Sequence, residues 1–388
     1  MSTRVILFLS VFLLVYSAGH YYIGLRCWQL LGAVFPLLSI RLYWLLFLLL
    51  AVSPLIGRFG GLYFSGRISS RINLVGAYWM AAAYYFFLLF LLVDGVCWGA
   101  AMLGLIPTRL LGVAAVVSGV AVFGLVSGLL FYGSWNARHP QIKYYDLSIA
   151  KAAGDLAELH IVMVSDIHLG SIVGNQRLEG LVSTINQLNP DVVLFAGDII
   201  DENVNHFVEQ KMPDTFRKLK PRFGSYAIFG NHEYIGGHAE QAVELLTAAK
   251  VTVLRDSYVN VDGRFSIVGR DDLTHQRMSG QPRKELAVIM EGIDRSLPVI
   301  MMDHQPFHLE EGQQQGVDLQ VSGHTHRGQL FPNNWITQRV FEVDWGYLRK
   351  GNYQVIVSSG FGTWGPPIRI GNTPEVVDIK LHFIPATC

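Results

Sequence analysis

The chain has 388 residues, of which 51% are hydrophobic and only 15% are Asp, Glu, Lys or Arg, a composition too apolar for an ordinary soluble protein. Because its 30 basic and 30 acidic side chains cancel, net charge gives no reason to expect a nucleic acid as partner. The three cysteines, Cys27, Cys97 and Cys388, form no CxxC pair, so neither a disulfide framework nor a zinc-thiolate site is indicated.

Charged residues are distributed unevenly along the chain. Residues 1–137 contain eight charged side chains and no Lys, whereas the remaining 251 residues contain 52. This shift predicts a domain boundary between Gly133 and His160. We therefore expect a membrane domain over residues 1–135, a linker over 136–157 and a second domain over 158–388.

Four apolar runs in the first domain are candidate membrane spans. A helix needs about 20 apolar residues to cross a bilayer, because lipid cannot satisfy exposed backbone groups. The charge-free runs, of 21, 22 and 24 residues, are Val5–Leu25, Ile72–Val93 and Leu110–Gly133. The run Leu37–Ile56 contains Arg41 and Pro54 near its ends, where an Arg can reach the headgroups. The sequence predicts an all-α membrane domain of about four transmembrane helices; the alternative for the first run is a cleaved signal peptide.

Basic residues suggest how such a multi-pass protein is oriented in the cell membrane. With four spans, the N-terminus, the loop after the second span and the second domain share one side. That side has more basic residues, namely Arg4, Arg58, Arg67, Arg71, Arg138 and Lys143 against Arg26, Arg41 and Arg109. The positive-inside rule then predicts a cytoplasmic second domain. Loss of the second span would reverse this assignment.

The second domain alternates short apolar runs with stretches of helical spacing such as Leu178–Leu188 and Ala239–Ala249. This alternation predicts an α/β fold with a mostly buried sheet. The runs of strand length are His160–Ser165, Val192–Ala196, Tyr226–Phe229, Phe265–Val268, Val299–Met302, Leu319–Ser322 and Gln354–Val357. Because ligands collect at the carboxyl ends of strands in such sheets, polar residues directly after these runs are the candidate site.

Five of the runs are followed by carboxylates, an amide or imidazoles. The five loops contain Asp166-Ile167-His168, Gly197-Asp198-Ile199-Ile200-Asp201, Gly230-Asn231-His232-Glu233, Asp303-His304 and Gly323-His324-Thr325-His326. Any one of them could be a turn or a hydrogen-bonded structural residue. Together, in this order and each at a strand end, they predict a two-metal site with mixed oxygen and nitrogen ligands.

This ordered set resembles the calcineurin-like metallophosphoesterase superfamily over about residues 158–383. Within it the chain is similar to the bacterial membrane-associated branch, in which GHTH is followed by Gly and Gln, here Gly328 and Gln329. The resemblance implies a four-layer α-β-β-α sandwich after the membrane domain. It also implies a hydrolase that acts on phosphoric ester bonds.

The resemblance assigns metal ligands by matched position. One metal would be held by Asp166, His168, Asp198 and His326, and the second by Asp198, Asn231, His304 and His324. Two cations bridged by Asp198 would activate a water for in-line attack on phosphorus. Ligands without Cys fit Mn²⁺, our first choice, as well as Fe or Zn²⁺. We expect Asp303 to orient the neighbouring His304.

The resemblance also implies roles at the substrate. His232 would contact the phosphate or protonate the leaving oxygen, with Asp201 orienting it; the alternative is a structural role for His232. Many phosphatases of the superfamily have Arg after the GDxxD block, where this chain has Glu202. Candidates for phosphate binding elsewhere are Arg270, Arg327 and Arg369, each of which could equally be a surface or structural Arg.

The sequence therefore predicts a phosphoesterase anchored in the lipid bilayer that hydrolyses a phosphate monoester, diester or pyrophosphate, with a lipid-linked substrate favoured. One alternative is a soluble nucleotide substrate, with the spans as a simple anchor. Another is a membrane sensor or scaffold with a catalytically silent metal site. Nothing in the sequence indicates an oligomeric state or nucleic acid binding.

Overall fold

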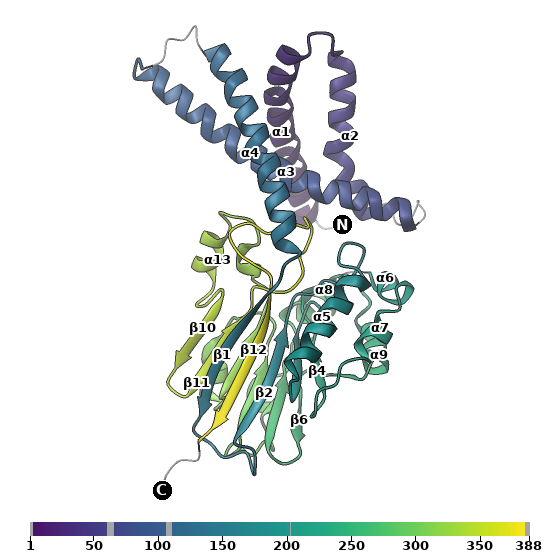
Figure 1. Ribbon diagram of the computed structural model, residues 1–388, viewed down its shortest axis with the longest axis vertical. Coiled ribbons are helices and arrows are strands. Elements are labelled where there is room, and N and C mark those ends of the chain that lie inside the picture. Colours follow the sequence, from purple (N-terminus) through teal and green to yellow (C-terminus); the bar gives the residue numbers. More distant parts are fainter. Residues whose placement is uncertain (1–2, 60–65, 106–110, 202, 385–388) are drawn as a thin grey trace. The chain divides into compact units, whose positions relative to one another are not determined.

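The computed structural model describes residues 3–59, 66–105, 111–201 and 203–384, and it divides into two compact units (Figure 1). The first comprises Met1–Ser134 with Gly365–Ile368, and the second Trp135–Trp364 with Arg369–Cys388. Four residues named above, Arg109, Leu110, Glu202 and Cys388, lie outside the described residues.

Four long helices form the first unit: α1 (Thr3–Val34), α2 (Ile40–Phe59), α3 (Gly66–Met102) and α4 (Leu111–Ala137), whose last three residues belong to the second unit. Each has a segment long and apolar enough to cross a membrane. The prediction of about four transmembrane helices is therefore confirmed, including the helix that contains Arg41 and Pro54. Helices α1, α3 and α4 are longer than the apolar runs because a helix continues beyond the hydrocarbon wherever its sequence allows.

Polar contacts join the helices of this unit. Arg26 on α1 and Asp94 on α3 form an ion pair with a separation of 2.6 Å. The hydroxyl of Tyr43 on α2 donates to the carbonyl oxygen of Gly24 on α1 at 2.7 Å. Since a bilayer offers no water to these groups, each finds its partner on a neighbouring helix.

The second unit contains two six-stranded sheets (Figure 1). The first sheet has the order β1 (Gln141–Ile149), β12 (Glu375–Phe383), β2 (Glu158–Val164), β3 (Val192–Ala196), β4 (Ser225–Ile228) and β5 (Val251–Val253). The second has the order β10 (Gly346–Lys350), β11 (Tyr353–Val357), β9 (Leu319–Ser322), β8 (Val299–Met302), β7 (Phe265–Gly269) and β6 (Ser257–Val261). In the middle of each sheet the strands run parallel, so their carboxyl ends share one edge.

Alternation along the strands shows how the layers are stacked. On β2, Ile161 and Met163 pack in a core that contains residues of both sheets, including Ile300 of β8. The intervening Val162 and Val164 pack instead with residues of α5 (Asn175–Leu188). Successive side chains of a strand point to opposite faces, so the first sheet lies between the second sheet and a helical layer.

A third core covers the outer face of the second sheet and includes Leu286 of α11 (Leu286–Ile289) and Leu309 of α12 (Leu309–Gln314). The predicted four-layer α-β-β-α sandwich is thus confirmed. The other short helices are α6 (Val204–Glu209), α7 (Met212–Phe216), α8 (Asn231–Ile235), α9 (Ala239–Ala248), α10 (Leu273–Ser279), α13 (Asn334–Val340) and a 3₁₀ turn, His326–Gly328.

The stretch expected to be a linker, 136–157, contains β1, which pairs in parallel with β12. This strand was missed because it is an edge strand, on which Asp146 and Ser148 are exposed. Its apolar side chains Leu147 and Ile149 point inward and join the core between the sheets. The first sheet therefore begins at Gln141, inside the stretch that was expected to be a linker.

The core beneath the helical layer yields a stability prediction. Phe195 on β3 is fully buried, and its ring meets that of Phe216 edge-on at a centroid distance of 5.4 Å. Because Phe195→Ala would remove this ring and leave a cavity, we expect the free energy of unfolding to fall by about 3–5 kcal/mol. Val208→Ala, at an exposed position, should change it by less than about 0.5 kcal/mol. Denaturant unfolding of the purified protein checks both, and equal effects would contradict the assigned core.

Candidate metal centre

The five predicted loops meet at one edge of the sandwich. Asp166 and His168 follow β2, Asp198 follows β3 and Asn231 follows β4, all in the first sheet, while His304, His324 and His326 follow β8 and β9 of the second. Backbone hydrogen bonds hold neighbouring loops together: His168 N–H donates to the Asp198 carbonyl oxygen at 3.0 Å, and Gly323 N–H donates to that of His304 at 3.0 Å. Residues up to 160 positions apart are thereby brought to one rim.

One ligand set consists of Asp166, His168 and His326, whose ligand atoms all lie within 4.8 Å of one another. His326 Nε2 is 3.4 Å from Asp166 Oδ1, and 3.0 Å from His168 Nε2. Two ring nitrogens and a carboxylate oxygen thus face the same point, as the predicted first metal requires.

A second set consists of Asp198, His304 and His324. His304 Nε2 is 3.3 Å from Asp198 Oδ2, and the amide oxygen of Asn231 is 3.0 Å from His324 Nδ1. Asp198 also faces His168 of the first set, whose Nε2 lies 3.8 Å from Asp198 Oδ2. Asp198 therefore lies between the two sets, where a bridging ligand has to lie.

The His304 side chain shows that the donor atoms fit a cation. Its Nδ1 donates to the Ala196 carbonyl oxygen at 2.8 Å, so in the neutral ring the lone pair lies on Nε2. This Nε2 is buried and has no hydrogen-bond partner among the described residues. A buried polar atom without a partner is costly, and a divalent metal is the partner that imidazole and carboxylate groups share.

Charges within the cluster depend strongly on one another. Burial raises the pKa of Asp166 to about 6. Burial would also raise the pKa of Asp198, but His304 and His232 outweigh it and hold that pKa well below its usual range. Conversely, burial would lower the pKa of His304, and the Asp198 carboxylate instead raises it well above its ordinary value. Asp198 is thus the anionic centre of the site.

The backbone at the ligands is strained. Asp166, His168 and Asp198 have φ angles of 52°, 53° and 50°, and His324 and His326 have 71° and 46°. Such left-handed conformations are uncommon for residues other than Gly. Such conformations cluster at functional sites, where the surrounding structure holds the backbone in place. Here they occur at five of the seven predicted ligands.

Two glycines allow the backbone to approach the ligands closely. A Cβ added at Gly230 would lie 2.2 Å from Asp198 Oδ1 and 2.6 Å from His304 Nε2. A Cβ at Gly323 would lie 2.3 Å from Asp166 Oδ2. No side chain fits at either position without displacing a ligand.

His232 and Asp201 lie beside the ligands at the more exposed edge of the site. His232 Nδ1 is 2.8 Å from Asp201 Oδ1, and the His232 backbone N–H donates to Asp198 Oδ1 at 2.9 Å. Burial would lower the pKa of His232, but Asp198 and then Asp201 raise it to about 9. In the absence of metal, both carboxylates therefore favour the charged form of His232. The predicted pairing of these two residues is present.

Glu233 fixes the loop in a way that the sequence analysis did not assign. Its two carboxylate oxygens accept hydrogen bonds from Ile200 N–H and Gly230 N–H, both at 2.8 Å. It thereby ties the loop after β3 to that after β4. The signal was available, since a Glu at the third position of a helix can reach back to the N-cap backbone.

Arg369 does not have the expected phosphate-binding geometry. It is fully buried. Its Nε donates to the Gly362 carbonyl oxygen, Nη1 to Ser359 and Asn372, and Nη2 to the Gly360 carbonyl oxygen and the ring of His326. All five guanidinium N–H groups point to protein acceptors, so Arg369 supports the ligand His326 instead of contacting substrate.

Arg270 is likewise placed away from the expected role. It is buried, and it forms ion pairs with Glu311 and with Asp303 at 3.7 Å. Asp303 also pairs with Arg283 at 3.2 Å and so does not orient His304, whose ring is fixed by the Ala196 carbonyl oxygen. The Arg327 guanidinium stacks 4.0 Å from the centre of the Trp345 ring. Of the three candidates, Arg327 alone is partly exposed.

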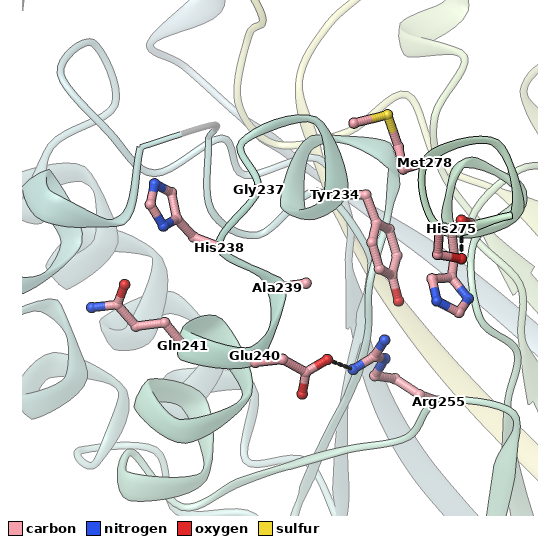
Figure 2. Close-up of a pocket in the computed structure, with 10 residues that line it drawn as sticks. Tyr234, Gly237, His238, Ala239, Glu240, Gln241, Arg255, His275 and Met278 are labelled. Atoms are coloured by element: carbon pink, nitrogen blue, oxygen red, sulfur yellow. Dashed lines mark hydrogen bonds and ion pairs between the residues drawn. The ribbon is translucent and has the colours of Figure 1, made fainter. Parts of the chain in front are cut away.

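A cavity of about 460 Å³ is lined in part by Tyr234, a residue of α8, the helix that also contains Asn231 and His232 (Figure 2). It is lined by Tyr234, Arg255 and His275, among others, and Arg255 Nη1 donates to Glu240 at 2.7 Å. The buried Asp271 behind it accepts a hydrogen bond from the Tyr234 hydroxyl. This cavity has a lining distinct from the metal ligands.

Comparison with known proteins identifies relatives. A family model described as calcineurin-like phosphoesterase matches residues 159–328. A transmembrane protein with metallophosphoesterase domain from Danio rerio is 33% identical over 68% of this chain and 60% of its own length. An uncharacterized metallophosphoesterase of Aquifex aeolicus is 33% identical over 58% of this chain and 85% of its own length. Another, from Bacillus subtilis, is 33% identical over 57% of this chain and 78% of its own length. This chain thus spans less than two thirds of the Danio rerio relative.

Among solved structures, a dimetal phosphatase from Danio rerio is similar to this chain with a TM-score of 0.35 and 12% identity, over 52% of this chain and 88% of that chain. A similarity of this size supports no conclusion by itself.

The close approach at Gly230 yields a prediction. Gly230→Ala would place a methyl group against Asp198 and His304, so we expect metal loss and a fall in hydrolysis of about 100-fold. Gly180→Ala, on α5 with open space around it, should leave both unchanged. Elemental analysis and ester hydrolysis measure the two effects, and full metal content in Gly230→Ala would contradict the ligand geometry.

Proposed function

Because the chain belongs to the calcineurin-like metallophosphoesterases, hydrolases of phosphoester bonds, we propose that it is a membrane-anchored, two-metal phosphoesterase whose substrate is lipid-linked. The observation that carries this proposal is the position of Asp198 between two ligand sets, with His232 and Asp201 beside it. A site that only binds a partner would not need a proton donor next to its ligands.

The geometry of the site supports the proposed metal ligands. Asp166, His168, Asp198 and His326 would hold one ion, and Asp198, Asn231, His304 and His324 the other. When bound, two divalent cations, for which we propose Mn²⁺, supply positive charge to the phosphoryl oxygens and an acidified water. The Ala196 carbonyl oxygen keeps the His304 ring in the tautomer that presents Nε2, and Arg369 packs against His326.

His232 would donate a proton to the leaving oxygen. Asp198 and Asp201 favour its protonated form, and its side chain is 14% exposed, compared with 1% for His168, so substrate can reach it. Asp201 accepts from Nδ1 and so leaves Nε2–H directed away from the carboxylate, available to the leaving group. Arg327, at the rim, is the remaining candidate for contact with the phosphate.

Membrane anchoring supports a substrate that is itself in the bilayer. Tethering raises the effective concentration of such a substrate at the site without any additional contact. We further propose that the four helices place the catalytic unit in the cytoplasm, because basic residues such as Arg71, Arg138 and Lys143 lie on its side of the spans.

The activity is tested with a panel of phosphate monoesters and diesters, both lipid and soluble, under added Mn²⁺. Asp198→Asn removes the shared negative charge, so we expect hydrolysis to fall to background and metal content to drop from about two equivalents per chain. Unchanged hydrolysis in Asp198→Asn would refute the two-metal assignment. Equal rates on soluble nucleotides and on lipid phosphates would favour the soluble-substrate alternative.

The role of His232 is tested separately. His232→Ala should lower kcat by about 10² to 10⁴-fold, because a general acid is lost, while metal content stays normal. Asp201→Asn should give a smaller loss in kcat, since the ring remains. If His232→Ala loses metal together with activity, the residue is structural.

A further inference from the structure

Large apolar side chains are exposed on the catalytic unit around α13. Trp335, Ile336 and Val340 are 56%, 61% and 55% exposed, and Phe331 and Trp364 are 42% and 50% exposed. We call these five side chains the interface patch. None of the residues of α13 is buried, so the helix presents its apolar side chains without covering any core.

Two contacts bring members of the patch together. The rings of Phe331 and Trp335 are 5.1 Å apart between centroids. The side chain of Gln329 bonds to the backbone of Trp364 in both directions, at 2.9 Å and 3.1 Å, which places Trp364 beside the segment that leads into Phe331. Exposed apolar groups that gather in this way mark an interaction surface, whereas single ones do not.

The patch borders the metal centre. Phe331 follows His326 by five positions. At the other end of the segment, Phe341 follows α13, and its ring lies 6.1 Å from that of His324. A surface that bound to this patch would therefore lie next to the metal centre.

The patch also lies close to the point where the chain leaves its last membrane helix. Asn136, in the final turn of α4, donates to the carbonyl oxygens of Arg369 and Asn372 at 3.0 Å and 2.7 Å. Between those two residues, Ile370 accepts a hydrogen bond from Phe331 N–H at 2.8 Å. Only residues 138–140 separate α4 from β1, a stretch of at most about 10 Å. Within the second unit, Asn136 and the patch are thus linked through short contacts.

The composition of the patch suits a lipid surface. Trp is enriched where membranes meet water, because its ring is apolar and its N–H is polar. Arg339, exposed on the same short helix, would favour anionic headgroups. We propose that the interface patch inserts into the headgroup region of the bilayer that holds this chain's own helices, and so brings the metal centre to the lipid surface. The docking rests on membrane anchoring and not on the proposed hydrolysis.

Insertion is tested by spin labelling of the full chain in liposomes of phosphatidylethanolamine and phosphatidylglycerol. One label is attached at Ile336→Cys and another at Met278→Cys, a matched position that is 60% exposed on α10, both in a chain with Cys27, Cys97 and Cys388 changed to Ala. We expect the ratio of collisions with oxygen to collisions with a water-soluble nickel chelate to be at least about threefold higher at position 336, because oxygen concentrates in lipid.

Equal ratios at the two positions would overturn the proposal. Broadening of the position 336 spectrum by a label on a second copy would overturn it too, because another copy would then be the occupant of the patch. Neither result depends on enzymatic activity, so the docking can fail or stand independently of the proposed function.

A second measurement uses turnover. In Trp335→Ser/Ile336→Ser we expect hydrolysis of a soluble aryl phosphate ester to stay within about twofold, and that of a long-chain lipid phosphate in liposomes to fall at least about fivefold. Equal loss on both substrates would show a structural effect and overturn docking as the function of the patch. If the unaltered protein hydrolyses only the soluble ester, the lipid-linked substrate is refuted, and the label ratios still decide whether the patch inserts.

Discussion

The buried carboxylate of Asp198 is the interaction on which the site depends. It faces His304 at 3.3 Å and His168 at 3.8 Å, and it accepts the backbone N–H of His232. A charge in this position is tolerable only if it is surrounded by donors and cations. The strained loops, the close approach of Gly230 and the tautomer of His304 all serve to surround it, which explains why so many unusual local features occur within one rim.

The ligands are held by the sandwich and also by a chain of contacts outside it. Arg369 connects the ring of His326 to four backbone or side-chain acceptors in the loop before β12, and Asn136 at the end of α4 donates to the Arg369 carbonyl oxygen. His326 is therefore supported from behind by residues that join the last membrane helix to the catalytic unit. Since ligand positions have to be kept within a fraction of an ångström, Asn136 and Arg369, both in the second unit, have a part in holding the site.

Much of this arrangement could be predicted from the sequence, because buried parallel strands are apolar runs and ligands follow their carboxyl ends. All seven predicted strands are present, and the loop residues from Asp166 to His326 converge as expected. Edge strands such as β1 and β10 were missed, because half of their side chains are exposed or polar. The roles of the three arginines could not be predicted, since a guanidinium that binds phosphate and one that binds carbonyl oxygens have the same sequence signal. The contacts of Arg369 and Arg270 in the structure are what identify these two residues as structural arginines.

The position of β12 in the first sheet sets an order of events for a newly made chain. β12 lies between β1 and β2, although more than 200 residues separate it from either strand in the sequence. Until the ribosome has released Glu375–Phe383, β1 and β2 have no neighbour on their facing edges, and the sheet stays open while the helices have already entered the bilayer. Completion of the hydrolase unit is thus a late event in biosynthesis, and during that interval the open edges are the part of the nascent protein most exposed to mispairing.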